Sequence, residues 1–546
     1  MKFTKALVAA LIITLSFVSY SNEALANDSH DVALSIAEGI LGVPFEVDSN
    51  QHVFEFPGGG RVITWQFLDL LGHTLNPGEF AFSGVGNVFN TELGDVFIVS
   101  MDDELFLYID IGSGLEVSLS EEFRQYSSFR LEILEYDFAA DALYFVETIE
   151  AVHPIFLFPD MLAEDYEDVR NEFLERAASI NDTTEFAFAM QQYVRVLQDG
   201  HMSFASRQLF GNLFANVDWT FENGRLFLIN DGNERAEVVK IGGVTVPEIL
   251  EVIERYFFFE NEFDRQFNTA IMTRNRGIHQ RAGADLSDGY ITITVDTNGE
   301  LTDVVIEYQS GWLPADFTQP RYVIRYEELD DDIFFISLRS FRFSEPYHQQ
   351  TIEAIENAIE SGTRHFILDL RDNSGGNSQV GAELLQAMGI SLPNFGTYRR
   401  LSTRAWDQRV EFLPEDRIEF MVDLLEDNYG ELFPESLPSI ESASNRYGVT
   451  VAVLTNNITY SSATMTATWI QDGGLGVVIG EPSTNAPSAF GDSIFFVLPH
   501  SRMQLSVSYS RFVRPDTQAD QTTLWPDIPV DQSLAMEAAL EFFADK

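Results

Sequence analysis

The stretch from Val449 to Asp472 constrains the fold of this chain most, because it has the pattern of a complete strand, loop and helix. Val449 to Leu454 is an apolar run rich in β-branched residues, typical of a buried strand. A polar loop follows, and residues 463–471 then have helical character. A hydroxyl at such a junction lies among unpaired backbone N–H groups, at the positive end of the helix dipole. Ser461 is therefore either a helix N-cap or a nucleophile.

A second unit of the same kind lies upstream. Phe366 to Leu370 has the pattern of a buried strand, and it is followed by a turn containing Gly375 and Gly376 and then by a helix. The two glycines let the backbone approach a ligand closely, and their N–H groups at a helix N-terminus suit an oxyanion. The same pattern also fits a tight strand–helix turn. The alternation of strands and helices from about residue 321 predicts an α/β fold with helices packed on a sheet.

Composition and periodicity divide the chain into further segments. Residues 27–130 are rich in β patterns and turn signals, which predicts an N-terminal β-rich accessory domain. Residues 131–214 carry apolar residues at helical spacing, and residues 215–320 mix strand and helix patterns with hairpin turns. Residues 321–546 form the predicted α/β core.

The first residues have the pattern of an export signal. Basic residues precede an apolar run over 6–18, and Ala24-Leu25-Ala26 has the small-x-small form of a cleavage site. We expect residues 1–26 to be a signal peptide and the protein to be secreted or periplasmic, with an uncleaved N-terminal anchor as the alternative. No later segment approaches ~18 uninterrupted apolar residues, so we expect no membrane span in the mature chain.

Charge and residue usage exclude several classes of function. With 33 basic and 85 acidic residues, the net charge of −52 would repel nucleic acid. The chain has no cysteine, which excludes disulfides and thiol catalysis. No HExxH motif occurs and the histidines never pair at i, i+4 spacing, so the sequence offers poor support for metal-assisted hydrolysis. His201 follows a helix that ends at a glycine; it suits either a structural role or the base that a hydroxyl nucleophile needs.

Several segments, taken in order, resemble peptidase family S41, the tail-specific or C-terminal processing serine peptidases. They are the lead-in from Tyr144 to Pro154, the LQDGH of 197–201, the FILDLRDNSGG of 366–376, and the TYSSA of 459–463 with Gln471-Asp472 and the IGEP of 479–482. The likeness covers roughly 135–540 and is strongest to the tricorn-like branch. It implies a ClpP/crotonase-like core that hydrolyses polypeptides without a cofactor.

The resemblance also implies residue roles. Ser461 matches the nucleophile, with Ser462 one residue out of register, and His201 matches the general base. The oxyanion donors match the N–H of Gly375 or Gly376 and the N–H of Ser462. Asp520 is the nearest candidate for the acid that supports the histidine.

Asp520 is shorter than the glutamate that the family has there, and two further departures from the family pattern shape the prediction. The lysine that some members carry 25 residues after the serine is Ala486 here, so the base is His201 or absent. The serine that precedes the histidine in the tricorn-type site is Gly200. A second hypothesis is therefore a catalytically inactive peptide-binding protein on the same scaffold. Neither the substrate nor the oligomeric state follows from the sequence.

Overall fold

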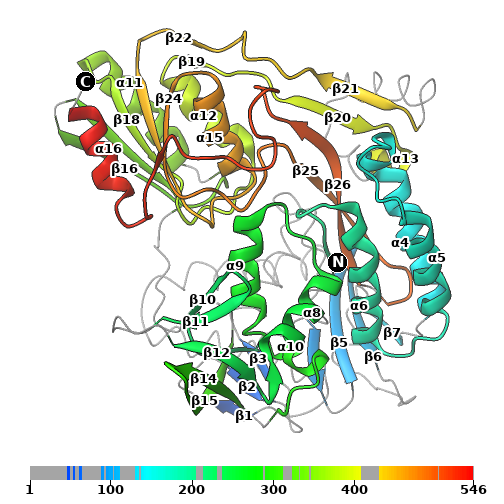
Figure 1. Cartoon of the computed structure of the whole chain (residues 1–546). Helices are drawn as coiled ribbons and strands as arrows, with labels where there is room; N and C mark the ends of the chain where they lie inside the picture. The colour runs from blue at the N-terminus through cyan, green and yellow to red at the C-terminus, as the bar shows by residue number, and fades with distance from the viewer. Residues whose placement is uncertain are drawn as a thin grey trace. The chain divides into compact units, whose positions relative to one another are not determined.

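The structure is a computed structural model (Figure 1). It describes residues 46–48, 53–55, 61–63, 88–91, 94–101, 104–110, 129–133, 137–204, 213–229, 236–286, 289–310, 323–330, 332–343, 346–407, 430–501 and 503–544. The signal peptide expected over 1–26 lies outside these ranges. The chain divides into two compact units, residues 1–137 with 499–504, and residues 138–498 with 505–546.

The described elements of the first unit are strands. They form a sheet of order β1-β2-β3 and a sheet of order β4-β5-β6-β7, in which β6 and β7 run parallel. Their bounds are β1 Glu46–Asp48, β2 Val53–Glu55, β3 Arg61–Ile63, β4 Val88–Thr91, β5 Gly94–Met101, β6 Glu104–Asp110 and β7 Phe129–Ile133.

A six-stranded sheet forms the core of the second unit, in the order β16-β17-β18-β23-β24-β27. Its strands are β16 Ile324–Asp330, β17 Ile333–Leu338, β18 His365–Asp369, β23 Thr450–Thr455, β24 Gly476–Gly480 and β27 Ile528–Pro529. All neighbours are parallel except the edge strand β16. Ser337 pairs with Asp369 and Asp369 with Leu454, so the carboxyl ends of the central strands meet at one edge.

Helices cover both faces of this sheet, which explains the continuous apolar runs in its strands. Alternate strand residues point to opposite faces: Phe334 and Ile336 pack in one hydrophobic cluster and Phe335 in the other. Three helices complete the first cluster and one completes the second. The upper left of Figure 1 shows these helices around the sheet. They are α11 Tyr347–Ser361, α12 Ser378–Ala387 and α15 Ser462–Asp472 on the first face, and α16 Ala535–Ala544 on the second.

Two more sheets belong to this unit. The first has the order β21-β20-β26-β25, with β8 paired to β26, and the second has the order β10-β11-β12-β14-β15-β9, with β13 paired to β12. The strands of the first are β8 Ser203–Phe204, β20 Gly396–Arg400, β21 Leu432–Ser436, β25 Phe490–Val497 and β26 Gln504–Val513. The strands of the second are β9 Leu213–Ala215, β10 Trp219–Glu222, β11 Arg225–Leu228, β12 Glu237–Ile241, β13 Val244–Thr245, β14 Tyr290–Thr297 and β15 Glu300–Ser310. A short ladder pairs β19 Ile390–Ser391 with β22 Ser444–Asn445.

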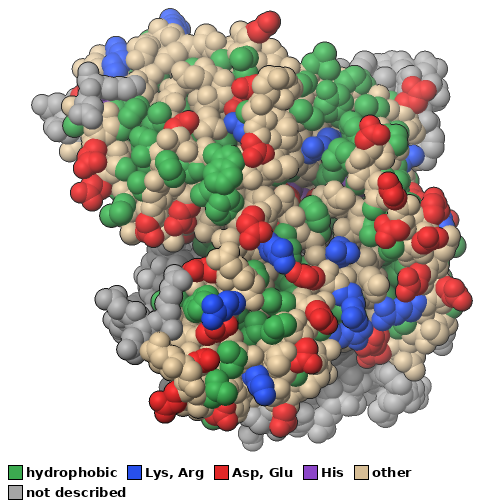
Figure 2. Space-filling model, viewed as in Figure 1, with side chains coloured by type: hydrophobic (Ala, Val, Ile, Leu, Met, Phe, Trp, Pro, Cys, Tyr) green, Lys and Arg blue, Asp and Glu red, His purple; other side chains and the backbone are tan. Residues whose placement is uncertain are grey.

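Apart from one, the remaining helices precede the α/β core or accompany the second of these sheets. They are α4 Phe138–Val152, η2 Pro154–Leu157, α5 Tyr166–Ala177, α6 Thr183–Val194, η3 Arg195–Leu197, α8 Val246–Tyr256, α9 Glu262–Met272 and α10 Arg276–Arg281. The exception, α13 Thr403–Asp407, packs against α4. In the described ranges, no helix is long and apolar enough to cross a membrane. Figure 2 shows acidic side chains scattered over the visible face of the protein rather than gathered in one patch.

The structure confirms the predicted α/β class and many of the predicted elements. The strand and helix expected around Ser461 are β23 and α15, and the strand expected over Phe366 to Leu370 is β18. One of the hairpin turns expected within 215–320 is Asn298-Gly299, which joins β14 and β15, and both residues have positive φ, as a tight hairpin turn requires.

Candidate active site

Ser461 lies at the tip of a strained turn between β23 and α15. Its backbone has φ 52° and ψ −121°, a conformation that costs a non-glycine residue about 1–3 kcal/mol and is held by its surroundings. Its side chain makes no capping hydrogen bond to the helix, although it occupies the N-cap position. The sequence left open a capping role and a nucleophilic role for Ser461. Side-chain capping is absent, and the strained turn suits a hydroxyl that is exposed to a substrate.

The turn with the two glycines packs directly against Ser461. A Cβ added to Gly375 would lie 2.7 Å from the Cβ of Ser461 and 3.0 Å from the N of Ser462, so only glycine fits this close approach. The N–H of Gly375 donates to Oδ1 of Asn373 at 2.9 Å. Across the described residues, the N–H groups of Gly376 and Ser462 have no acceptor. Gly376 and Ser462 are thus the donors that remain open to an oxyanion.

The side chain of Ser462 has a separate structural role. Its hydroxyl donates to the carbonyl of Gly376 at 2.6 Å, and the residue is 6% exposed. This bond ties the first turn of α15 to the glycine turn. The two adjacent serines therefore differ. The Ser462 hydroxyl is bonded to a backbone carbonyl, whereas the Ser461 hydroxyl makes no capping hydrogen bond to α15.

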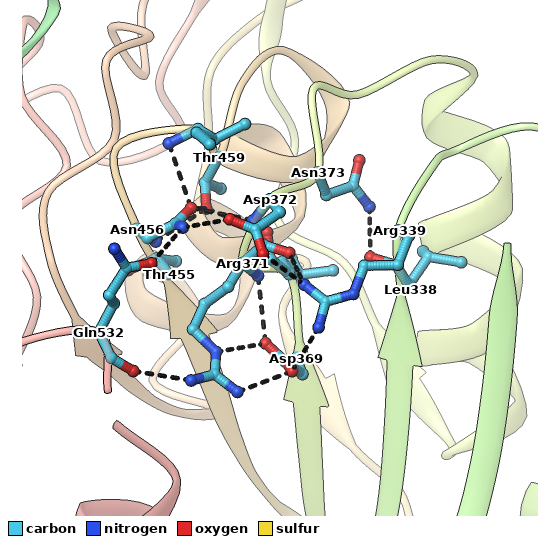
Figure 3. Close-up of polar contacts among 12 residues, drawn as sticks. Leu338, Arg339, Asp369, Arg371, Asp372, Asn373, Thr455, Asn456, Thr459 and Gln532 are labelled. Carbon is cyan, nitrogen blue, oxygen red and sulfur yellow. Dashed lines mark hydrogen bonds and ion pairs between the residues drawn. The ribbon is translucent and has the colours of Figure 1, made fainter. Parts of the chain in front are cut away.

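A polar network fixes the glycine turn at the edge of the sheet (Figure 3). Asp369, which is 2% exposed, receives both arms of the Arg371 guanidinium at 2.8 and 2.9 Å. Arg339 approaches the same carboxylate at 3.5 Å and Asp372 at 3.1 Å. The side chain of Asn456 bonds Asp372 through both its amide and its oxygen. The loops after β18 and β23 are thereby joined to each other before they reach Ser461.

His201 reaches this site from another part of the fold. Its imidazole packs against Tyr460, the residue before Ser461, with 4.9 Å between ring centroids. Its backbone N–H donates to Asp199 at 2.7 Å, and Asp199 in turn bonds the buried His153 at 3.0 Å. His201 and Ser461 make no hydrogen bond to each other in the described structure. Catalytic hydrogen bonds often tighten only when substrate binds, so the absence of this bond is compatible with His201 acting as the base for Ser461.

Glu260 is the carboxylate that faces His201. It lies between α8 and α9, its side chain is 6% exposed, and one of its oxygens lies 3.8 Å from Nδ1 of His201. The same oxygen accepts from the Tyr460 hydroxyl at 3.0 Å. Its other oxygen accepts from the side chain of Asn485 and from the backbone N–H of Ala486, each at 2.7 Å. Burial lowers the pKa of His201, but the carboxylates of Glu260 and Asp199 outweigh it and raise that pKa overall.

Asp520, expected to support the histidine, is engaged elsewhere. One of its oxygens accepts from the N–H and hydroxyl of Thr522 at 2.9 and 2.8 Å, and the other from the indole of Trp525 at 3.0 Å. These bonds close its own loop. Glu260, in a segment where the family pattern gave no reason to look, is the acid that the structure brings to His201.

The two departures from the family pattern have a common physical explanation. At position 486, the backbone N–H rather than a lysine side chain faces the site, and it binds Glu260. At position 200, a Cβ would lie 2.4 Å from Oε1 of Glu260 and 2.6 Å from the Tyr460 hydroxyl. A serine at 200 would therefore displace the carboxylate. Gly200 leaves space for the Glu260 carboxylate and the backbone of Ala486 binds it, so both departures fit the observed position of Glu260.

The described ranges contain no group of three or more side chains that could bind a metal ion. Residues 332–530 match the sequence pattern of one family, described as Peptidase family S41. This part of the chain belongs to peptidase family S41. The S41 domain contains Ser461 and the glycine turn, whereas His201 and Glu260 lie upstream of the matched residues. The chain therefore contains a domain of a serine-type peptidase family.

Comparison with solved structures supports the fold of the S41 domain. The crystal structure of mature CPAF matches with a TM-score of 0.50 and 14% identity, over 75% of this chain and 96% of that one. The structure of mature CPAF complexed with lactacystin gives the same TM-score and identity, over 75% and 97%. The photosystem II D1 C-terminal processing protease matches at 12% identity, over 72% and 94%, but with a TM-score of only 0.37. No curated protein sequence matches the chain significantly.

Proposed function

We propose that this protein is an endopeptidase that hydrolyses polypeptides through an acyl-enzyme on Ser461, with His201 as the general base. One observation carries the proposal: Ser461 lies on a strained turn beside two open N–H groups, at a site that His201 reaches from a separate segment. Strain of this kind in a non-glycine residue is typical of sites where the backbone presents a functional side chain.

The reaction follows from this arrangement. His201 Nε2 takes the proton of the Ser461 hydroxyl as Oγ bonds to the carbonyl carbon of the scissile peptide. The N–H groups of Gly376 and Ser462 hold the resulting oxyanion. The C–N bond then breaks, and the imidazolium gives its proton to the leaving amine. Water, deprotonated by His201, attacks the ester and restores the free serine.

Labelling with a fluorophosphonate separates this function from its main alternative. We expect the wild-type protein to be labelled, Ser461→Ala not to be labelled, and His201→Ala to be labelled far more slowly. Ser462→Ala keeps its backbone N–H and should retain most of the labelling, which distinguishes the two adjacent serines. Ser179→Ala, at an exposed serine in the turn just after α5, serves as the neutral control.

Each other outcome has a defined meaning. Labelling that persists in Ser461→Ala would refute the assignment of the nucleophile. A wild-type protein that is neither labelled nor active on unfolded casein, but that binds casein peptides, would be the inactive peptide-binding protein instead. The pattern of residues 1–26 supports export of the enzyme, and N-terminal sequencing of protein recovered outside the cytoplasm would test it.

A further inference from the structure

Glu260 lies outside the residues that match the S41 family, yet it forms the centre of the polar contacts around His201. Both carboxylate oxygens are occupied, one by Tyr460 and the other by Asn485 and Ala486. Three donors on a carboxylate that is 6% exposed replace the water it loses on burial. Among the described residues, Nδ1 of His201 is buried without a hydrogen bond.

We propose that Glu260 is the positioning residue of His201: its carboxylate receives the Nδ1 proton and so turns Nε2 toward Ser461. The catalytic consequence rests on the function proposed above. A histidine base needs the proton on the nitrogen remote from the nucleophile, and a carboxylate at that nitrogen fixes this tautomer and stabilises the imidazolium that forms. The 3.8 Å between the two groups shortens to a hydrogen bond with a small rotation of either side chain.

Other charged groups around His201 do not take this role. Asp199 accepts the backbone N–H of His201 and is already bonded to His153, so it holds the main chain rather than the ring. Arg511 lies against Phe490 and, with burial, its pKa falls to about 10. Asp264 binds the backbone N–H of Glu260 at 2.8 Å and holds the segment rather than the ring.

The segment that carries Glu260 is docked onto the S41 domain by its neighbours. The side-chain amide of Asn261 donates to the carbonyls of Ser483 and Thr522, at 3.2 and 3.1 Å. Phe263 packs edge-on against Trp525, with 5.4 Å between ring centroids. The loop that Asp520 closes is thus the surface on which this segment rests. His201 can be oriented only when the α8–α9 connection is seated there.

A titration of His201 tests the contact without depending on peptidase activity. The protein would be labelled with ¹³C at histidine Cε1, and the His201 signal assigned by its loss in His201→Gln. We expect Glu260→Gln to lower the pKa of His201 relative to the wild-type protein. Glu254→Gln, which removes an equal charge from an exposed ion pair between α8 and α9, should leave the pKa of His201 unchanged. Asp520→Asn should also leave it unchanged, and a shift in Asp520→Asn but not in Glu260→Gln would overturn the proposal.

Activity supplies the second test. We expect Glu260→Gln to lower kcat by roughly 10²–10⁴-fold with little change in KM, and Glu260→Asp to restore part of it. Gly200→Ala displaces the carboxylate without altering it, so it should lower both kcat and the pKa of His201. Full activity in both Glu260→Gln and Gly200→Ala would refute the positioning role. If the pKa of His201 is the same in Glu260→Gln as in the wild-type protein, this proposal alone is refuted. If Ser461→Ala keeps peptidase activity, the proposed function alone is refuted.

Discussion

The side-chain oxygen of Asn485 accepts the backbone N–H of Ser461 at 2.7 Å. The amide nitrogen of the same side chain donates to Glu260 at 2.7 Å. Asn485, which is 3% exposed, therefore joins the turn that presents the hydroxyl to the carboxylate that faces the histidine. The Asn485 side chain therefore fixes the Ser461 turn relative to the Glu260 carboxylate.

Asn485→Ala should weaken the fold and the reaction together. The Ser461 N–H would lose its acceptor in a part-buried place, which costs about 1–3 kcal/mol of unfolding free energy. Displacement of the turn should lower kcat by up to about 10²-fold. Urea denaturation and the rate of fluorophosphonate labelling measure the two effects. Asn171→Ala, at an exposed position, should change stability by less than about 0.5 kcal/mol, and an equal loss in both variants would contradict the role of Asn485.

Gly375→Ala should destabilise the protein more than another glycine replacement with similar backbone geometry. Gly375 has φ +97° and Gly243 has φ +81°, but nothing lies within 4 Å of a Cβ at 243. Gly243→Ala therefore carries only the backbone cost of about 1–2 kcal/mol. Gly375→Ala adds about 1–3 kcal/mol of overpacking against Ser461 and Tyr460. Thermal unfolding of the pair measures the difference, and equal losses would show that the turn has room.

The acidic limb of kcat/KM should lie above pH 6.5. Burial disfavours the charged ring of His201, but the carboxylates of Glu260 and Asp199 outweigh it, so the pKa is raised from 6.5. The base must be neutral, so activity increases as the pH rises through this pKa. A pH–rate profile on a peptide substrate measures the midpoint. In Glu260→Gln the midpoint should move to lower pH while the plateau falls, and an unmoved midpoint would mean that another group titrates.

Asp264 should make the protein less stable as the pH rises toward neutrality. Burial raises its pKa from 3.8 to about 7, with the nearby charge of Glu260 adding to the effect. The folded state therefore holds a proton between about pH 4 and 7 that the unfolded state has lost, and stability falls across that window by at most about 1.4 kcal/mol per pH unit. Asp264→Asn should flatten this slope. Urea denaturation at several pH values, compared between the two proteins, measures it, and parallel slopes would exclude Asp264 as the cause.

The sequence was sufficient to predict the strand, turn and helix on either side of the site. Apolar runs such as Phe366 to Leu370 are explained by burial on both faces of a sheet, which periodicity reports directly. The choice of Ser461 over Ser462 came from register alone, and the structure adds a physical difference between the two hydroxyls. It remains a prediction until the labelling is done.

Glu260 could not be predicted from the sequence, because no local pattern marks it. It follows three phenylalanines between two helices, and its role depends on contacts with Asn485 and Ala486, far along the chain. The absence of a side chain at Gly200 was the available signal, since a glycine beside the base leaves space for another group. Asp520 was chosen by its distance from Pro526, and position along the chain did not reveal that its carboxylate closes its own loop.

The pairing of β8 with β26 has a consequence for the order in which the chain is made. Ser203 and Phe204, just after His201, find their partners only in Ser506 and Leu505. Arg514, which is 3% exposed, closes on Asp472 at the end of α15 at 2.6 Å. On the ribosome, a growing chain therefore contains His201, Glu260 and Ser461 before it contains the strand that pairs with the segment just after His201.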